Sequence, residues 1–311
     1  MRINNMKTKK RFLGGGLKRI YGRTVAFVIS IALMMTSQGQ FYQVFAKNNN
    51  TEAIYISYDG NPENDGKSPE TALDFYSCFS DEGELKPGFS GKTLVFCGDF
   101  TNLDVGYITI SNAIDLIGDG AKFKNVAFII TSDNVTLKDF EVTQEADIYT
   151  IYVNDCENVT IEGNTINMTA LSGYNSYAVY SCDCDNLIMR DNKITYVGNT
   201  DGTVFNNAVR IEAMQSDGKT TVEDNTFDIA LPSVDVASDY DTVEPIIYNE
   251  GIVFDGCAEL TISGNDIKVR SNDKITQYGY DSIYGVSVLN LDHKGENDER
   301  DPREMDVIME I

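Results

Sequence analysis

Arg210, Glu212 and Asp255 are the residues of this sequence whose types and spacing could carry chemistry. They fall in two short segments of alternating side chains, VRIE at 209–212 and IVFD at 252–255. Successive side chains of a β-strand point to opposite faces, so two such strands side by side would present the guanidinium and both carboxylates on one surface. Glycoside hydrolysis uses two carboxylates about 5–10 Å apart on one face. These three residues are therefore the candidate catalytic group. The alternative is that Arg210 only forms a salt bridge to Glu212 or to a neighbouring acid.

Long insertions enter the strand that carries this group. They lie at about 168–177, 196–207, 228–250 and 270–284, and they are rich in Tyr. Loops gathered on one side of a rigid scaffold commonly carry function, and Tyr offers a flat apolar ring with a hydroxyl, which suits sugar rings. The alternative is that these rings only pack the loops onto the scaffold. The candidate ligand-binding residues are Tyr152, Asn154, Tyr180, Tyr240, Tyr248 and Tyr280.

The same insertions hold carboxylates that could bind a cation. Asp235, Asp239 and Asp241 lie close together in the sequence, and Ca²⁺ takes several oxygen ligands from such groups. A Ca²⁺ site at these three residues is the one metal that we expect here. No other cofactor is indicated, since no cysteine pair has the CxxC spacing of a zinc site.

A repeated nine-residue unit must position these side chains. Its copies begin at Ala113, Asn134, Asn158, Asn186, Lys219 and Glu259, in steps of 21, 24, 28, 33 and 40 residues. Each copy predicts a short strand, a tight bend and the start of a second strand. Self-similarity at this spacing predicts a solenoid in which each unit stacks on the one before. Four copies carry Asn at the seventh position, and we expect an amide ladder through Asn164, Asn192, Asn225 and Asn265.

The copies, together with the segment YDGNPENDGKSPETAL at 58–73, resemble the right-handed parallel β-helix proteins of bacteria. This is the pectate-lyase-like superfamily in the broad sense, and the resemblance covers about residues 51–290. It implies an all-β fold, a right-handed parallel β-helix solenoid with an N-terminal capping helix. It also implies lyase chemistry in which Ca²⁺ neutralises a uronate and Arg210 abstracts a proton. This architecture hosts many functions, however, and the Gly-His-Gly segment of polygalacturonases is absent.

Three of the six cysteines precede a copy by two residues, so they should occupy one site on different rungs: Cys156, Cys184 and Cys257. We expect a ladder of buried thiols there, with Cys acting as a small apolar residue. An even number of cysteines in an exported chain also fits disulfides, and Cys78 could pair with Cys97.

The first 46 residues predict a secretory signal peptide. They hold eight Lys or Arg and no acid, then the apolar run 25–35, and they end at Ala46. This is the basic, apolar and small-residue order of an export signal, and eleven apolar residues are too short to cross about 30 Å of hydrocarbon.

We divide the remaining chain into three parts. Residues 47–105 should form an N-terminal cap of strand, helix and strand, with the helix starting at Ser68-Pro69. Residues 106–290 should form the parallel β-helix. The charged tail, 291–311, could add one edge strand through its apolar residues near 307–311, and we expect it to end a truncated precursor.

Acidic residues dominate the charge. The chain has 25 basic and 48 acidic residues, a net charge of −23; without the signal the counts are 17 and 48, a net charge of −31. Such a surface repels nucleic acid and anionic lipid, so we expect no nucleic-acid partner and no membrane insertion after signal cleavage.

We therefore expect a monomeric bacterial protein, secreted or on the cell surface, that binds extracellular polysaccharide or glycan as an adhesin does. One alternative is a polysaccharide lyase or glycoside hydrolase acting on acidic polysaccharide. A structural stalk with no ligand is the other.

Overall fold

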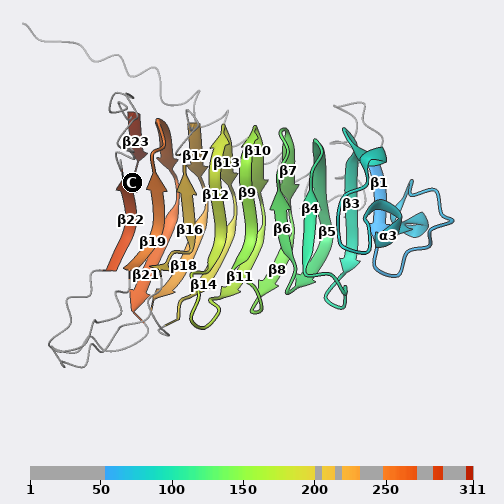
Figure 1. The fold of residues 1–311 in the computed structure, drawn as a ribbon, viewed down its shortest axis with the longest axis horizontal. Helices are drawn as coiled ribbons and strands as arrows, with labels where there is room; N and C mark the ends of the chain where they lie inside the picture. Colours follow the sequence, from blue (N-terminus) through green and yellow to red (C-terminus); the bar gives the residue numbers. More distant parts are fainter. Residues whose placement is uncertain are drawn as a thin grey trace, which may run out of the picture. The chain divides into compact units, whose positions relative to one another are not determined.

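A computed structural model of the chain describes residues 53–199, 205–213, 219–231, 248–271, 283–289 and 306–310, all within one compact unit, Glu52–Ile311. The predicted signal peptide lies outside these residues. Their strands form two sheets, of 15 and 8 strands, in which neighbouring strands run parallel. Figure 1 shows these strands side by side in successive rungs. The described part of the chain is thus all-β and built from all-parallel sheets, as expected for a parallel β-helix.

The first strands of the nine-residue copies stack in register in the larger sheet, which confirms the predicted repeat. Second residues of consecutive copies are partners, as in Ile114 with Val135, Val135 with Val159, and Thr220 with Leu260. We term this row face 1. Its strands are β3 (Thr93–Asp99), β5 (Ile114–Lys124), β7 (Val135–Lys138), β10 (Val159–Glu162), β13 (Leu187–Arg190), β17 (Lys219–Glu223), β20 (Glu259–Ser263) and β23 (Asp306–Glu310).

The second strands of the copies form face 2 of the same sheet. They are β8 (Glu141–Gln144), β11 (Thr165–Thr169), β14 (Lys193–Val197), β18 (Thr226–Leu231) and β21 (Asp266–Ser271). Strand β5 joins the two faces, because residues 114–117 pair with β7 and residues 122–124 pair with β8. Gly118 lies at this corner, where a Cβ would stand 2.4 Å from the carbonyl oxygen of Asp139. A residue without a side chain is therefore required for the next turn to pack there.

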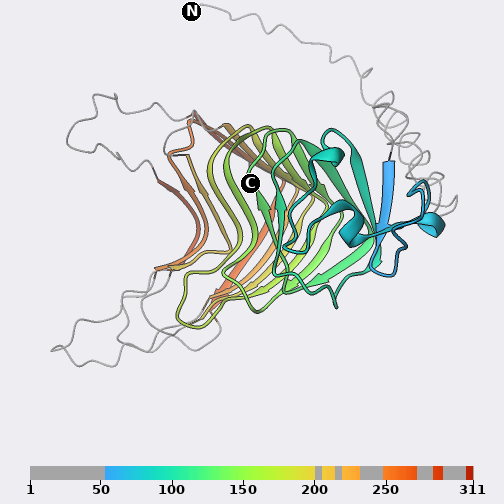
Figure 2. The same ribbon diagram turned by 45° about the vertical axis from the view of Figure 1, so that its right-hand side comes forward.

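The smaller sheet forms face 3, which bears the candidate site. Its strands are β4 (Tyr107–Ile110), β6 (Ala127–Ile130), β9 (Tyr149–Glu157), β12 (Tyr177–Asp185), β15 (Phe205–Asn206), β16 (Val209–Glu212), β19 (Tyr248–Asp255) and β22 (Ile283–Leu289). The turned view in Figure 2 shows the chain coiling from one face to the next. Inward-pointing residues of strands on all three faces form one continuous apolar core.

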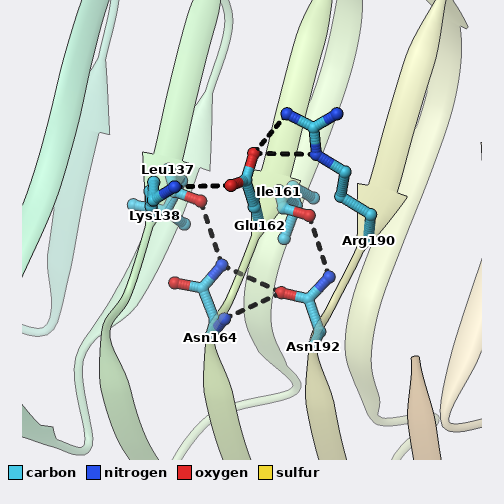
Figure 3. A network of polar contacts seen from close by, with 7 residues as sticks. All are labelled: Leu137, Lys138, Ile161, Glu162, Asn164, Arg190 and Asn192. Carbon is cyan, nitrogen blue, oxygen red and sulfur yellow. Dashed lines mark hydrogen bonds and ion pairs between the residues drawn. The ribbon is translucent and has the colours of Figure 1, made fainter. Parts of the chain in front are cut away.

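The four repeat asparagines lie at the corner between faces 1 and 2. Asn164 donates through its backbone N–H and Nδ2 to Oδ1 of Asn192, at 3.0 and 3.1 Å, and its Nδ2 also donates to the Leu137 carbonyl at 2.9 Å. The same bonds join Asn192 to Asn225 and Asn225 to Asn265. Figure 3 shows the first two members. Each amide thus satisfies a backbone donor and a backbone acceptor that the bend leaves inside the coil.

A charged row runs outside this ladder on face 1. Glu162 binds Lys138 Nζ at 2.5 Å on one oxygen and Arg190 Nη2 at 2.5 Å on the other, as Figure 3 also shows. The opposite charges fall on successive rungs, so each neutralises the next.

The N-terminal segment differs in detail from the single amphipathic helix that we predicted. A 3₁₀ turn, η1 (Pro69–Thr71), is followed by the short strand β2 (Leu73–Asp74), which pairs with β1 (Ala53–Ser57), and only then by the one-turn helix α3 (Phe75–Cys78). Pairing of β2 interrupts the helix. The segment still buries Phe75 and Phe79, whose rings stack 4.6 Å apart, with Phe79 packed against Phe96 of β3. Another 3₁₀ turn, η2 (Pro87–Phe89), precedes β3.

The last described strand lies in the tail. β23 (Asp306–Glu310) pairs with β20, with Val307 opposite Leu260. The edge strand that the apolar residues near 307–311 predict is therefore formed.

Candidate functional site

Two rows of outward side chains bring most of the described candidate residues together on face 3. In the first row Tyr152, Tyr180 and Arg210 are partners on successive strands. In the second, Asn154 is followed by Cys182, then by Glu212 and Asp255. Alternation produces both rows, because the residues between them point into the core.

Arg210, Glu212 and Asp255 form one network. Arg210 Nε donates to Glu212 Oε1, and Arg210 Nη2 lies 3.8 Å from Asp255 Oδ2. The hydroxyl of Tyr180 donates to the other oxygen of Glu212 at 2.6 Å. The three charged side chains are only 17%, 13% and 3% exposed. One cation therefore faces two carboxylates in a largely desolvated place.

Four tyrosines stack beside this network. The rings of Tyr149, Tyr152, Tyr177 and Tyr180 lie 4.9–5.9 Å apart between centroids, with interplanar angles of 12–24°. The strand spacing of about 4.8 Å brings equivalent rings of neighbouring rungs face to face. Tyr152 also donates its hydroxyl to Asn154 Oδ1 at 2.9 Å.

Three tyrosines of this stack, Tyr149, Tyr177 and Tyr180, line a pocket of about 460 Å³ together with Tyr174, Arg210 and Glu212. This volume lies within the range of small-ligand sites. Tyr174 is the most exposed of the aromatic residues at the pocket, at 59%. The lining residues are Ile148, Tyr149, Tyr174, Asn175, Tyr177, Tyr180, Arg210 and Glu212.

The ionisation of the lining residues favours binding over proton transfer. Burial raises the pKa of Tyr177 to about 12. Burial, followed by the hydrogen bond to Glu212, also raises the pKa of Tyr180. For Arg210, burial by itself would lower the pKa, but the bond to Glu212 and the charges around it outweigh this effect, so its pKa lies above the ordinary value. The tyrosines are therefore neutral donors, and Arg210 stays a cation.

The carboxylates are also poorly placed for glycoside hydrolysis. Both oxygens of Glu212 accept protein hydrogen bonds, from Arg210 and Tyr180. The guanidinium of Arg210 binds Glu212 and Asp255 together, whereas a glycosidase places its substrate between its two carboxylates.

Several predicted site residues lie outside the part of the chain that the structure describes. These are Tyr240, Tyr280, Asp235, Asp239 and Asp241, together with the side chain of Tyr248, whose backbone begins β19. Within the described ranges, no group of three or more His, Cys, Asp or Glu is placed to hold a metal ion.

The cysteines lie mostly inside the coil. Cys156 and Cys184 are partners on adjacent strands and both are buried. Their contact and their burial raise the pKa of Cys184. Cys257 is also buried and lies beside the Thr220 hydroxyl, which donates to its Sγ. All six cysteines, Cys78 and Cys97 among them, are free thiols.

Two features of this region escaped the sequence prediction. Tyr149 belongs to the stack, and the repeated spacing of Tyr149 to Tyr152 and of Tyr177 to Tyr180, 28 residues apart, was the signal that could have revealed it. A second, exposed amide ladder joins Asn186 to Asn158 at 2.7 Å and Asn158 to Asn134 at 3.3 Å. These asparagines are the first residues of three successive copies, so the repeat itself marks them.

The fold and the site define a class of protein, an all-β chain of parallel sheets with a tyrosine-lined pocket on one face. Comparison with protein-family models, curated proteins and solved structures found no match. No helix in the described ranges is long and apolar enough to cross a membrane.

Proposed function

We propose that this protein is an exported, right-handed parallel β-helix of the pectate-lyase-like kind that binds extracellular polysaccharide or glycan through the pocket on face 3. The observation that carries the proposal is the pocket itself, in which four tyrosines meet the pair of Arg210 and Glu212. In this proposal residues 1–46 direct export, and the N-terminal segment around α3 acts as the cap of the coil.

The chemistry of the lining supports a saccharide ligand. Aromatic side chains contribute apolar surface for the C–H faces of a sugar ring, and their hydroxyls, with Asn175 and Glu212, offer donors and acceptors for its hydroxyl groups. Apolar walls with a few placed polar groups are typical of small-ligand sites. A stalk without a ligand gives no reason for such a concave surface.

Binding is better supported than catalysis. Arg210 remains protonated, so it offers no base to a substrate, and Glu212 is held in place by Arg210 and Tyr180. We therefore expect no unsaturated or reducing ends to appear when the protein is incubated with uronate polymers, with or without Ca²⁺. Turnover that disappears in an Arg210→Ala variant whose thermal unfolding shows it to be folded would restore the lyase assignment.

The test is affinity electrophoresis of the purified protein on a panel of immobilised soluble polysaccharides. Wild-type protein should be retarded by at least one of them. Tyr174→Ala should weaken retardation about two- to tenfold, since an aromatic contact contributes roughly 0.5–1.5 kcal/mol and the side chain of Tyr174 is accessible to a ligand, at 59% exposed. Its removal should leave the fold intact.

Tyr58→Ala is the matched control, because Tyr58 is also an exposed tyrosine, at 41%, but does not line the pocket. It should bind as wild type does. Absence of retardation across the whole panel, or equal effects of the two substitutions, would contradict the proposed function.

A further inference from the structure

We infer that the pocket on face 3 selects an amine-bearing, cationic saccharide, such as a polymer of amino sugars with free amines, and rejects uronates. The inference rests on the proposed function and adds the charge class of its ligand.

Carboxylates outnumber cations when the wall of the pocket is taken together with the residues directly behind it. Arg210 is the one basic residue among the described lining residues, and it is paired with Glu212, which also lines the pocket. Asp255 is not a lining residue, but its Oδ2 lies 3.8 Å from Arg210 Nη2, so the three side chains together carry a formal charge of −1. Asp147, also outside the lining, adjoins Ile148 and accepts hydrogen bonds from the Ile148 backbone and the Tyr107 hydroxyl.

Low exposure strengthens this imbalance. The Arg210, Glu212 and Asp255 side chains are 17%, 13% and 3% exposed, so solvent screens their charges less than it screens surface charges. A uronate carboxylate entering the pocket would meet like charges at a desolvated site, an arrangement that costs several kcal/mol at interfaces. The guanidinium offers little compensation, because two protein carboxylates already engage it.

An ammonium group has partners in the same place. It donates three hydrogen bonds and accepts none, and each carboxylate oxygen has two lone pairs. The oxygens of Glu212 each accept one protein hydrogen bond, so each keeps acceptor capacity for a ligand. Tyrosine rings at the wall also attract cations through their negative faces. The net charge of −23 of the whole chain favours approach of the same class of ligand.

The experiment compares three oligosaccharides of equal length by isothermal titration with the full protein. One is a glucosamine oligomer with free amines, the second its N-acetylated form and the third a uronate oligomer. At pH about 6, where amino groups of ordinary basicity are protonated, the free-amine oligomer should bind at least tenfold more tightly than the acetylated one. The uronate should bind most weakly.

Glu212→Gln preserves size and removes one charge at the pocket, so it should reduce the free-amine preference about tenfold. Glu162→Gln is the matched control. It removes the same charge from the whole molecule, but Glu162 lies on face 1 between Lys138 and Arg190, outside the pocket lining, so the preference should stay. Thermal unfolding of each variant shows whether it is folded.

The outcomes separate the two claims. If none of the three oligosaccharides and no polysaccharide of the wider panel binds, the proposed function is overturned. Binding with equal or greater affinity for the uronate would overturn only the charge class, as would equal effects of the two Gln substitutions. A short lysine oligomer that binds as tightly as the amino sugar would also overturn it, because the pocket would then recognise charge without the sugar.

Discussion

The Arg210 guanidinium lies between two carboxylates that the fold removes from water, and this environment governs what the residue contributes. Arg190 offers the contrast. It binds Glu162 in a similar way, but its own side chain is 42% exposed against 17% for Arg210. Buried charges lose their hydration and depend on their partner, whereas an exposed partner can be replaced by water.

Arg210→Ala should therefore destabilise the fold by about 3–5 kcal/mol, because Glu212 and Asp255 would stay in a desolvated place without their cation. Arg190→Ala should cost only about 0–1 kcal/mol, since Glu162 keeps Lys138. Urea unfolding of both variants measures the difference. Similar losses of unfolding free energy in the two variants would show that burial does not determine how much the Arg210 ion pairs stabilise the fold.

The thiols give a second prediction at this scale. Burial raises the pKa of Cys78 and Cys97 to about 12 and that of Cys182 and Cys257 to about 11. Thiolate is the reactive form, so these cysteines of the native protein should react slowly with a thiol reagent at about pH 8, and faster as the pH rises.

Protein purified without reductant should show six thiols in denaturant. Four thiols would indicate one disulfide, with Cys78 and Cys97 the first pair to examine by peptide mapping.

At the scale of the elements, the corner between faces 1 and 2 depends on its amide ladder. Asn192 accepts bonds from the backbone N–H and the Nδ2 of Asn164 and donates to the Ile161 carbonyl. Asn192→Ala should destabilise the protein by about 2–4 kcal/mol, because it leaves buried backbone groups without partners.

Asn186→Gly is its control on the same rung. Asn186 belongs to the exposed ladder, where water can replace the lost bond, and its φ of 56° is one that Gly adopts without strain. The cost should therefore stay below about 1 kcal/mol. Denaturant unfolding compares the two variants. A smaller loss for Asn192→Ala than for Asn186→Gly would mean that the buried ladder is not a source of stability.

The repeat made these elements predictable, because every rung of a solenoid has the same succession of strand, bend and second strand. Asn164 and its counterparts mark the corner in four copies, and the alternation of Val209 to Glu212 sets which side chains face outward. The copy at Ala113 lacks the Asn, and its strand β5 continues through the corner without a break. Gly is required at position 118 of this strand only because the backbone of Asp139 approaches it closely. A contact of this kind between two rungs cannot be predicted from the sequence around either residue.

The arrangement of the candidate site could also be predicted in part from the sequence. The repeat fixes the register of neighbouring strands, and this register predicts the two rows of outward side chains that contain Tyr180 and Glu212. The alternative in which Arg210 forms a salt bridge to Glu212 or to a neighbouring acid is confirmed. How deeply these charges are buried could not be predicted, because burial depends on side-chain rotamers and on the packing of neighbouring rungs. The glycan-binding role of the insertions also stays a prediction, since Tyr240, Tyr280 and the proposed Ca²⁺ ligands lie outside the described residues.

At the scale of the whole molecule, the excess of carboxylates acts on stability and on binding at once. With 48 acidic and 25 basic residues, the folded chain brings like charges together, and this repulsion opposes compaction. The same field attracts a cationic ligand to face 3. Dissolved salt screens both effects.

Raising NaCl from about 0.02 to about 0.3 M, which shortens the screening length severalfold, should therefore act in opposite directions on the two properties. Thermal stability should rise by a few degrees, roughly 1 kcal/mol on the usual scale, because repulsion within the fold is relieved. Affinity for the free-amine oligosaccharide should fall over the same range, while that for its acetylated form should hold steady. Differential scanning calorimetry and titration on one protein preparation measure the pair. If thermal stability falls as salt is added, attractive ion pairs such as that of Lys138 with Glu162 outweigh the net repulsion. If the affinity for the free-amine oligosaccharide does not change with salt, the pocket does not select its ligand by charge.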